Sequence, residues 1–324
     1  AVGKDALEAN TSGQNVAFGA NALATVTTGT QNTAIGHDGL TVNTGSNNTG
    51  LGYQALTANT TATYNTAVGS LAMQLTTTGI SNTGVGGQAL QNNTTGSNNV
   101  AVGVNALDEN TTADNNTALG QGALKLNTTG ASNVAVGTYA LDANTTAANN
   151  TAVGYSALGS NTTGASNVAV GANALDANTT AAGNVAIGPS ALGVNTTGAT
   201  NTAIGNEALD ANTTASNNVA VGHASLGANT TGGTNTAVGT NALAANTTAV
   251  ANVALGYSSL YTNTTGANNT ALGFEALALS TTGDNNTAVG KDALRANTTG
   301  TQNVAVGSAS LDANTTASYN TAVG

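Results

Sequence analysis

The stretch Val168–Asn184 reads VAVGANALDANTTAAGN, and the next stretch, Val185–Asn201, reads VAIGPSALGVNTTGATN. The two match position by position over 17 residues, and the same pattern fills the chain of 324 residues. Counting from Val16 gives 18 copies up to Asn320, of which the copy from Thr33 is one residue short, with a partial copy at each end. A fixed period of this kind is typical of solenoids and arrays. We therefore treat residues 1–324 as a single repeat array.

We number the repeat from position 1, which Val168 occupies, to position 17. Position 4 is Gly and position 17 is Asn in every copy, whereas position 8 is Leu in all full copies except one, where Met73 replaces it. Position 3 is a branched aliphatic residue except at Phe18, position 7 is mostly Ala, and positions 11–13 usually read Asn-Thr-Thr. Position 14 alternates between Gly and Ala through most of the chain, which suggests an underlying pair of 34 residues. In the two quoted copies the structural repeat positions are Val170, Gly171, Leu175, Asn178, Asn184, Gly188, Leu192, Asn195 and Asn201.

The composition argues against an ordinary globular domain. Only 6% of the residues are charged and 3% are aromatic, and Cys and Trp are absent. Large apolar side chains, which supply most of the energy of a globular core, are therefore scarce. The four Lys and Arg residues are too few for nucleic-acid binding, and no apolar run approaches the length of a membrane span. The abundance of Thr and Val favours β-structure over disorder.

These features predict an all-β fold, a parallel β-solenoid or β-roll with one coil per copy. The strand is expected from position 17 through position 3 of the next copy, and coils stacked at about 4.8 Å would form a rod on the order of 90 Å long. Alternation along the strand puts positions 1 and 3 on one face, and we place these inside the coil. The Ala at position 2 would then face outward and pack against a second chain. Positions 5–10 fit either a second strand or a short helical turn.

The invariant positions have direct physical interpretations. Gly at position 4 predicts a turn with positive φ or a close approach of two backbones. Leu at position 8 is expected to be the one large core residue of each coil. The Asn columns at positions 11 and 17 are expected to form side-chain ladders that bond nearby backbone groups.

The pattern N-T-A-V-G-x-x-A-L-x-x-N-T-T-G resembles the head repeats of trimeric autotransporter adhesins of the YadA type. It resembles still more closely the arrays of phage tail-fibre-like and bacterial surface proteins that often end in an endosialidase-type chaperone domain. The resemblance covers the whole chain and implies a homotrimeric rod, outside the cell, at the cell surface or on a virion. The repeat is a few residues longer than the adhesin head repeat, and no functional residue carries over.

Candidate chemistry is sparse. His37 and His223 both occupy position 5, in distant copies, where we interpret them as exposed corner residues. Acidic residues gather at position 9, mostly two coils or about 10 Å apart, which is too far for paired-carboxylate catalysis; they are Asp108, Asp142, Asp176, Asp210 and Asp312. We predict no catalytic residue, no metal site and no cofactor.

Two further interpretations concern Asn-Thr-Thr. It is formally a glycosylation sequon, as at Asn144 and Asn178, although structural ladders are the preferred interpretation. Its Thr columns could also form an ice-binding surface, either from positions 11 and 13 together or from position 12 alone.

The functional prediction is a structural fibre or stalk segment that supports attachment, without enzyme activity. Its partner is expected to be the chain itself, as a homotrimer or an end-to-end filament, with a receptor or glycan bound through flanking domains. Neither nucleic acid nor a membrane is an expected partner. The alternative is a binding module whose lateral surface adheres to ice or glycans. Heterogeneous residues at positions 5–6, 9–10 and 15–16 favour the stalk.

Overall fold

The computed structural model describes residues 1–11 and 13–324 and confirms the predicted fold class. It is a parallel β-solenoid of about 18 turns with one three-residue strand per repeat. The contacts divide it into two compact units, Ala1–Ala165 and Ser166–Gly324, which are built from the same coil. No segment of the described residues forms a membrane-spanning helix.

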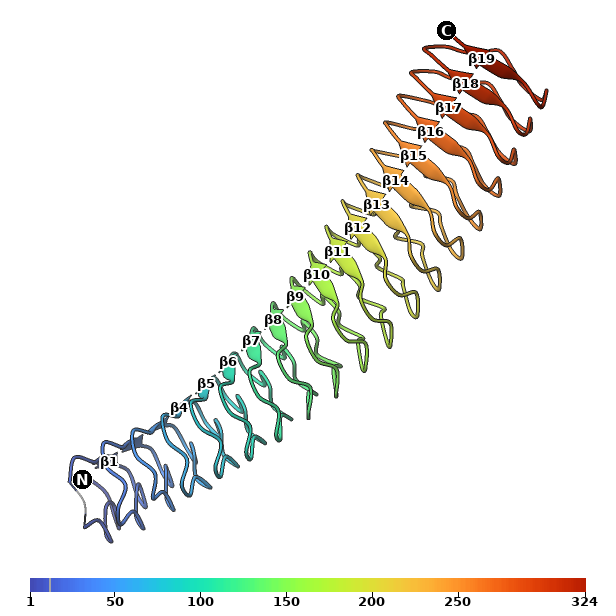
Figure 1. Cartoon of the computed structure of the whole chain (residues 1–324). Helices are drawn as coiled ribbons and strands as arrows, with labels where there is room; N and C mark the ends of the chain where they lie inside the picture. The colour runs from blue at the N-terminus through green and yellow to red at the C-terminus, as the bar shows by residue number, and fades with distance from the viewer. Residues whose placement is uncertain (12) are drawn as a thin grey trace. The chain divides into compact units, whose positions relative to one another are not determined.

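The strands are regularly spaced in both units. The first unit contains β1 (Val16–Phe18), β2 (Thr33–Ile35), β3 (Thr49–Leu51), β4 (Thr66–Val68), β5 (Thr83–Val85), β6 (Val100–Val102), β7 (Thr117–Leu119), β8 (Val134–Val136) and β9 (Thr151–Val153). The second unit contains β10 (Val168–Val170), β11 (Val185–Ile187), β12 (Thr202–Ile204), β13 (Val219–Val221), β14 (Thr236–Val238), β15 (Val253–Leu255), β16 (Thr270–Leu272), β17 (Thr287–Val289), β18 (Val304–Val306) and β19 (Thr321–Val323). Within each unit every strand pairs in parallel with the strand of the next coil, in register at equal repeat positions, so that Ala186 faces Ala203 and Ala203 faces Ala220 (Figure 1).

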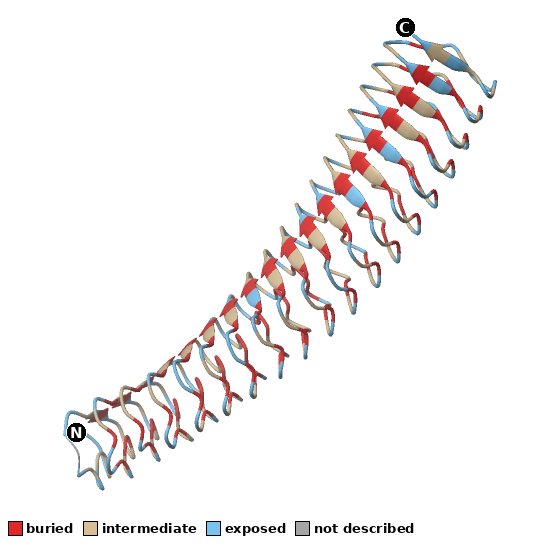
Figure 2. Ribbon diagram, in the orientation of Figure 1, coloured by how far each residue is buried: buried red, intermediate tan, exposed pale blue. Residues whose placement is uncertain are grey.

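The predicted orientation of the strands was wrong. The position-2 residue is buried inside the coil, as at Ala203, whereas its neighbours Thr202 and Ile204 are partly exposed and face outward. Buried and more exposed segments accordingly alternate along the ribbon in Figure 2. A three-residue strand offers one inward side chain, and the interior already holds the position-8 Leu. At Gly50 an added Cβ would lie 3.4 Å from Leu40 Cδ1, which shows that position 2 packs against the Leu of the preceding coil. Only a small residue fits there, so the β-branched residues are left outside.

Positions 5–10 form neither of the two structures that the sequence left open. They are a succession of turns in which positions 6 and 8 both have positive φ, for example 56° at Asn173 and 52° at Leu175. Asn tolerates this conformation, but for Leu it is unfavourable and must be held by the surroundings. Leu175 is fully buried, and its backbone N–H donates to Ala191 O of the next coil at 3.0 Å. Leu is therefore the core residue that was predicted, in a backbone conformation that was not.

The position-4 Gly column shows both features that were predicted as alternatives, a positive φ and a close approach of two backbones. Gly171 has φ of 138°, and an added Cβ would lie 2.6 Å from the carbonyl oxygen of Gly188 in the next coil. A side chain here would therefore strain the backbone and also separate the coils.

The predicted Asn ladders are present and meet at one carbonyl. Asn212 Nδ2, at position 11, donates to Asn195 Oδ1 of the preceding coil at 2.9 Å and to Ala215 O at 3.1 Å. Asn201 Nδ2, at position 17, donates to the same Ala215 O at 2.8 Å, and its backbone N–H donates to Asn184 Oδ1 at 2.9 Å. These Asn side chains are fully buried, so this half of the interior is polar but hydrogen-bonded.

The position-11 ladder is interrupted where Ser280 replaces Asn. Asn263 Oδ1 and Ser280 Oγ are both buried there without a hydrogen-bond partner. We expect Ser280→Asn to raise the free energy of unfolding by about 1–3 kcal/mol, because the new amide would donate to Asn263 Oδ1 and leave no orphaned group. Denaturant-induced unfolding followed by circular dichroism measures the change.

The matched control introduces the same interruption into an intact part of the ladder. Asn246 Nδ2 donates to Asn229 Oδ1 at 2.8 Å, and its own Oδ1 accepts from Asn263 at 3.1 Å. Asn246→Ser should therefore lower stability by a similar amount. Equal stability of the two variants and the parent would show that the ladder does not stabilise the coil.

Candidate functional surfaces

The outward face of the sheet carries exposed apolar side chains in each unit. Position 1 is always Thr or Val, and position 3 is always apolar, so no charged residue lies on this face. In the second unit its large side chains are more than one-third exposed at several strands, including Ile187, Ile204, Leu255, Leu272 and Val306. Monomeric proteins rarely expose contiguous apolar surface on this scale. We call positions 1 and 3 the sheet face.

A column of exposed Thr residues runs along position 13. In the second unit all nine successive coils contribute one exposed Thr, namely Thr180, Thr197, Thr214, Thr231, Thr248, Thr265, Thr282, Thr299 and Thr316. Position 12 differs, because its hydroxyl donates to the carbonyl of the next coil, as from Thr196 Oγ1 to Thr213 O at 3.1 Å. Position 11 is buried Asn. Neither of the two predicted Thr arrangements is therefore correct, and the exposed column is position 13 alone.

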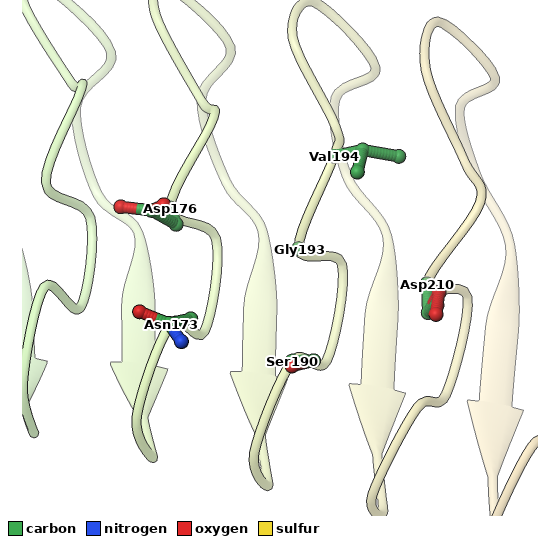
Figure 3. A pocket seen from close by; sticks show the side chains of 6 residues that line it. All are labelled: Asn173, Asp176, Ser190, Gly193, Val194 and Asp210. Carbon is green, nitrogen blue, oxygen red and sulfur yellow. The ribbon is translucent and has the colours of Figure 1, made fainter.

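Nearly all the charge lies on the turn segment. Every charged residue of the chain except Asp114 and Asp284 occupies position 5, 6, 9 or 10. We call these four positions the turn wall. In the close view of the second unit, the labelled turn-wall residues lie on the segment in front of the strands (Figure 3).

The two His residues lie on the turn wall and are more than half exposed, as predicted for corner residues. His37 Nδ1 lies 2.9 Å from Asp38 Oδ2, and its ring stacks on Tyr53 with centroids 5.8 Å apart. The pKa of Asp38 is lowered, chiefly because Asn21 donates a hydrogen bond to its carboxylate. Among the described residues no three His, Asp or Glu side chains converge in a way that could hold a metal ion.

Two of the position-9 carboxylates, Asp176 and Asp210, line a shallow hollow. The hollow, of about 310 Å³, is bordered by Asn173, Asp176, Ser190, Gly193, Val194 and Asp210 (Figure 3). Asp176 and Asp210 come from coils two apart, with Gly193 on the coil between them. Burial raises the pKa of both carboxyls. Asp312, at the same position, is exposed, and Asp142 is partly exposed.

The sequon residues are inaccessible in the folded coil. Asn144 and Asn178 are fully buried, and each donates its amide N–H to the position-14 carbonyl at 3.1 Å. The packed coil has no room for a glycan on either nitrogen. Their geometry agrees with the ladder interpretation.

Asp108 is the most unfavourably placed carboxylate. Its Oδ1 is buried without a hydrogen-bond partner, and burial, together with the charge of Glu109, raises its pKa. Since the folded pKa exceeds the unfolded one, ionisation of Asp108 lowers stability at neutral pH, and this cost vanishes as the pH falls through the folded pKa. Asp108→Ala should therefore raise the denaturation midpoint at pH 7, and the gain should shrink as the pH approaches 4.

Asp114→Ala is the control for this prediction. Asp114 is exposed and its Oδ1 accepts the backbone N–H of Ser97, so its removal should give no gain at pH 7. A gain for Asp108→Ala that stayed constant with pH would contradict an electrostatic cause.

The comparisons with known proteins do not add a family. No protein-family model and no curated protein matches this chain. Its functional interpretation therefore depends on the repeat motif and on the three surfaces described above.

Proposed function

We propose that this chain is a structural segment of an extracellular fibre, in which three copies pack together through their sheet faces. The observation that supports it most is the sheet face itself, which is uncharged at every strand and carries an apolar residue at position 3 beside Thr or Val at position 1. The role is that of a stalk that holds attachment domains away from a cell or virion surface. It needs no catalytic group.

The sheet face suits a second copy of the same chain. Its side chains recur in register with the coils, as in the pairing of Val185, Thr202 and Val219 at position 1. Parallel copies would therefore repeat the same contact at every coil, and each added coil would bury more apolar area. The Thr side chains at position 1 have nearly the shape of Val, so they preserve the flatness of the face.

This proposal places the contact between chains at other residues than those expected from the sequence. The sequence-based prediction placed the position-2 Ala at the contact between chains, but Ala at this position is buried inside its own coil. Positions 1 and 3 of the same strand take its place. The number of chains, three, is taken from the resemblance to trimeric adhesin heads.

A specific observation favours ice binding as a second candidate. In the second unit the Thr column at position 13 is uniform and exposed on successive coils, at the strand spacing of about 4.8 Å. Such a regular array of hydroxyl and methyl groups can order water. A single column offers less contact than a two-column array, so the fibre remains our preferred function.

The mass of the folded chain tests the fibre proposal. Sedimentation equilibrium should give three times the 30.9 kDa chain mass. The double variant Ile204→Lys, Leu255→Lys should sediment as a monomer with an unchanged circular dichroism spectrum, because two exposed residues of the sheet face would become charged. A monomeric parent chain would overturn the proposal.

Thr214→Lys and Thr248→Lys together form the matched control. This pair adds the same charge on the Thr column and should leave the trimer intact. Thermal hysteresis of the same proteins distinguishes the second candidate: ice binding requires activity that is lost in the Thr pair and kept in the sheet-face pair.

A further inference from the structure

Aromatic residues gather on the turn wall of the second unit, over the coils that carry β15 and β16. The rings of Tyr257 and Phe274, both at position 5 of successive coils, stack with centroids 5.3 Å apart and planes 13° apart. Lys291, at position 5 of the following coil, places Nζ 5.9 Å from the centre of the Phe274 ring. Tyr261 adds a third exposed ring from position 9. The chain has only nine Tyr and Phe residues, so three on two adjacent coils is a local concentration.

Polar groups of both charge signs surround these rings. Arg295 Nε lies 2.7 Å from Glu275 Oε2 and 3.7 Å from Asp292 Oδ1, and Lys291 Nζ lies 3.7 Å from Asp292 Oδ2. Two cations face two carboxylates, so the cluster has no net charge. Two of the four basic residues of the chain are found here.

Two of the rings, Tyr257 and Tyr261, share a hollow with Glu275 and Arg295. A cavity of about 300 Å³ is lined by Asn241, Tyr257, Ser258, Tyr261, Glu275, Ala278, Leu279 and Arg295. Its lining combines two phenol rings and an exposed Leu with an amide, a hydroxyl, a carboxylate and a guanidinium. Its volume is at the lower end of the range for small-molecule sites.

We propose that this hollow, which we name the tyrosine pocket, binds a neutral sugar ring. A pyranose has an apolar face of C–H groups, which packs on an aromatic ring, and a rim of hydroxyls, each of which donates and accepts hydrogen bonds. Tyr257 and Tyr261 supply the aromatic surface. Glu275 accepts from sugar hydroxyls, Arg295 donates to them, and Asn241 does both.

Charge and geometry favour a sugar over other small ligands. An anionic ligand would be repelled by Glu275 and a cationic ligand by Arg295. Because these two side chains pair with each other, their charges cancel and the pocket favours neither kind of ion. A purely apolar ligand would leave the polar lining without hydrogen bonds, which is costly. A neutral ligand with one apolar face and many hydroxyls satisfies both parts of the lining.

The site is independent of the proposed trimer. It uses positions 5, 6, 9 and 10, whereas the proposed contact between chains uses positions 1 and 3. Failure of one proposal therefore leaves the other standing. If both hold, the stalk itself carries a lateral glycan-binding site.

The test is saturation-transfer difference NMR of the full chain with cellobiose, maltose and lactose as probes. We expect transfer to the ring C–H protons of at least one disaccharide, with a dissociation constant of about 1 mM or tighter. Tyr257→Ala and Tyr261→Ala should each reduce the transfer, with the dissociation constant raised at least about fivefold, which corresponds to about 1 kcal/mol of binding free energy. Glu275→Gln should also weaken binding, because the amide accepts hydrogen bonds less strongly than a carboxylate.

Tyr155→Ala is the matched control. Tyr155 is also at position 5 and similarly exposed, but it lies in the first unit, and Tyr139 meets its ring edge-on at 6.4 Å. This variant should bind like the parent chain, and circular dichroism confirms that all variants are folded. No transfer to any of the three sugars, or transfer unchanged in both pocket variants, would overturn the proposal.

Discussion

Stacking of identical backbone paths is the constraint on which the rest of this structure depends. Each coil stacks in register on the next and hydrogen-bonds to it, so any side chain that displaces one backbone displaces its neighbour. This explains why position 4 is always Gly: a Cβ on Gly171 would lie 2.6 Å from the carbonyl oxygen of Gly188. The same constraint acts on the Gly residues of position 14, since a Cβ on Gly198 would lie 2.2 Å from Ala215 O. The stacking also holds Leu in a conformation that it rarely adopts elsewhere.

The interior of the coil shows how a chain with few large apolar residues can still be ordered. Each coil contributes one large apolar side chain, at position 8, packed against small residues at positions 2 and 7. The remaining interior is filled by two buried Asn columns whose amides bond both to each other and to backbone carbonyls. Buried amides are costly when unpaired and nearly neutral or better when paired. Periodicity supplies the partners, because an Asn can pair one coil away wherever the neighbouring copy also has Asn.

Stacking also repeats each exposed side chain from one coil to the next. An apolar pair at positions 1 and 3 becomes a face, a single exposed Thr becomes a column, and aromatic residues at position 5 of successive copies become a stack of rings. The turn wall, like positions 15 and 16, is free of strict periodicity. It therefore holds almost all the charges and both His residues. In our proposals, the uniform sheet face therefore serves assembly and the variable turn wall serves local recognition.

The sequence by itself predicted a parallel solenoid with a Leu core and Asn ladders. The evidence was the period of 17, the unvarying Gly and Asn and the shortage of large side chains. The solenoid, its Leu core and its Asn ladders depend on repetition alone. The Tyr257–Phe274 stack could also have been inferred from the sequence, since both aromatics occupy position 5 of successive copies. The inward face of the strand and the conformation of positions 5–10 needed the tertiary structure. Alternation along a three-residue strand is compatible with either face inward, and the choice depends on the space left by Leu at position 8, which belongs to another part of the coil. The tyrosine pocket likewise exists only once Asn241, Tyr257 and Arg295, from three different copies, are brought to one wall by stacking.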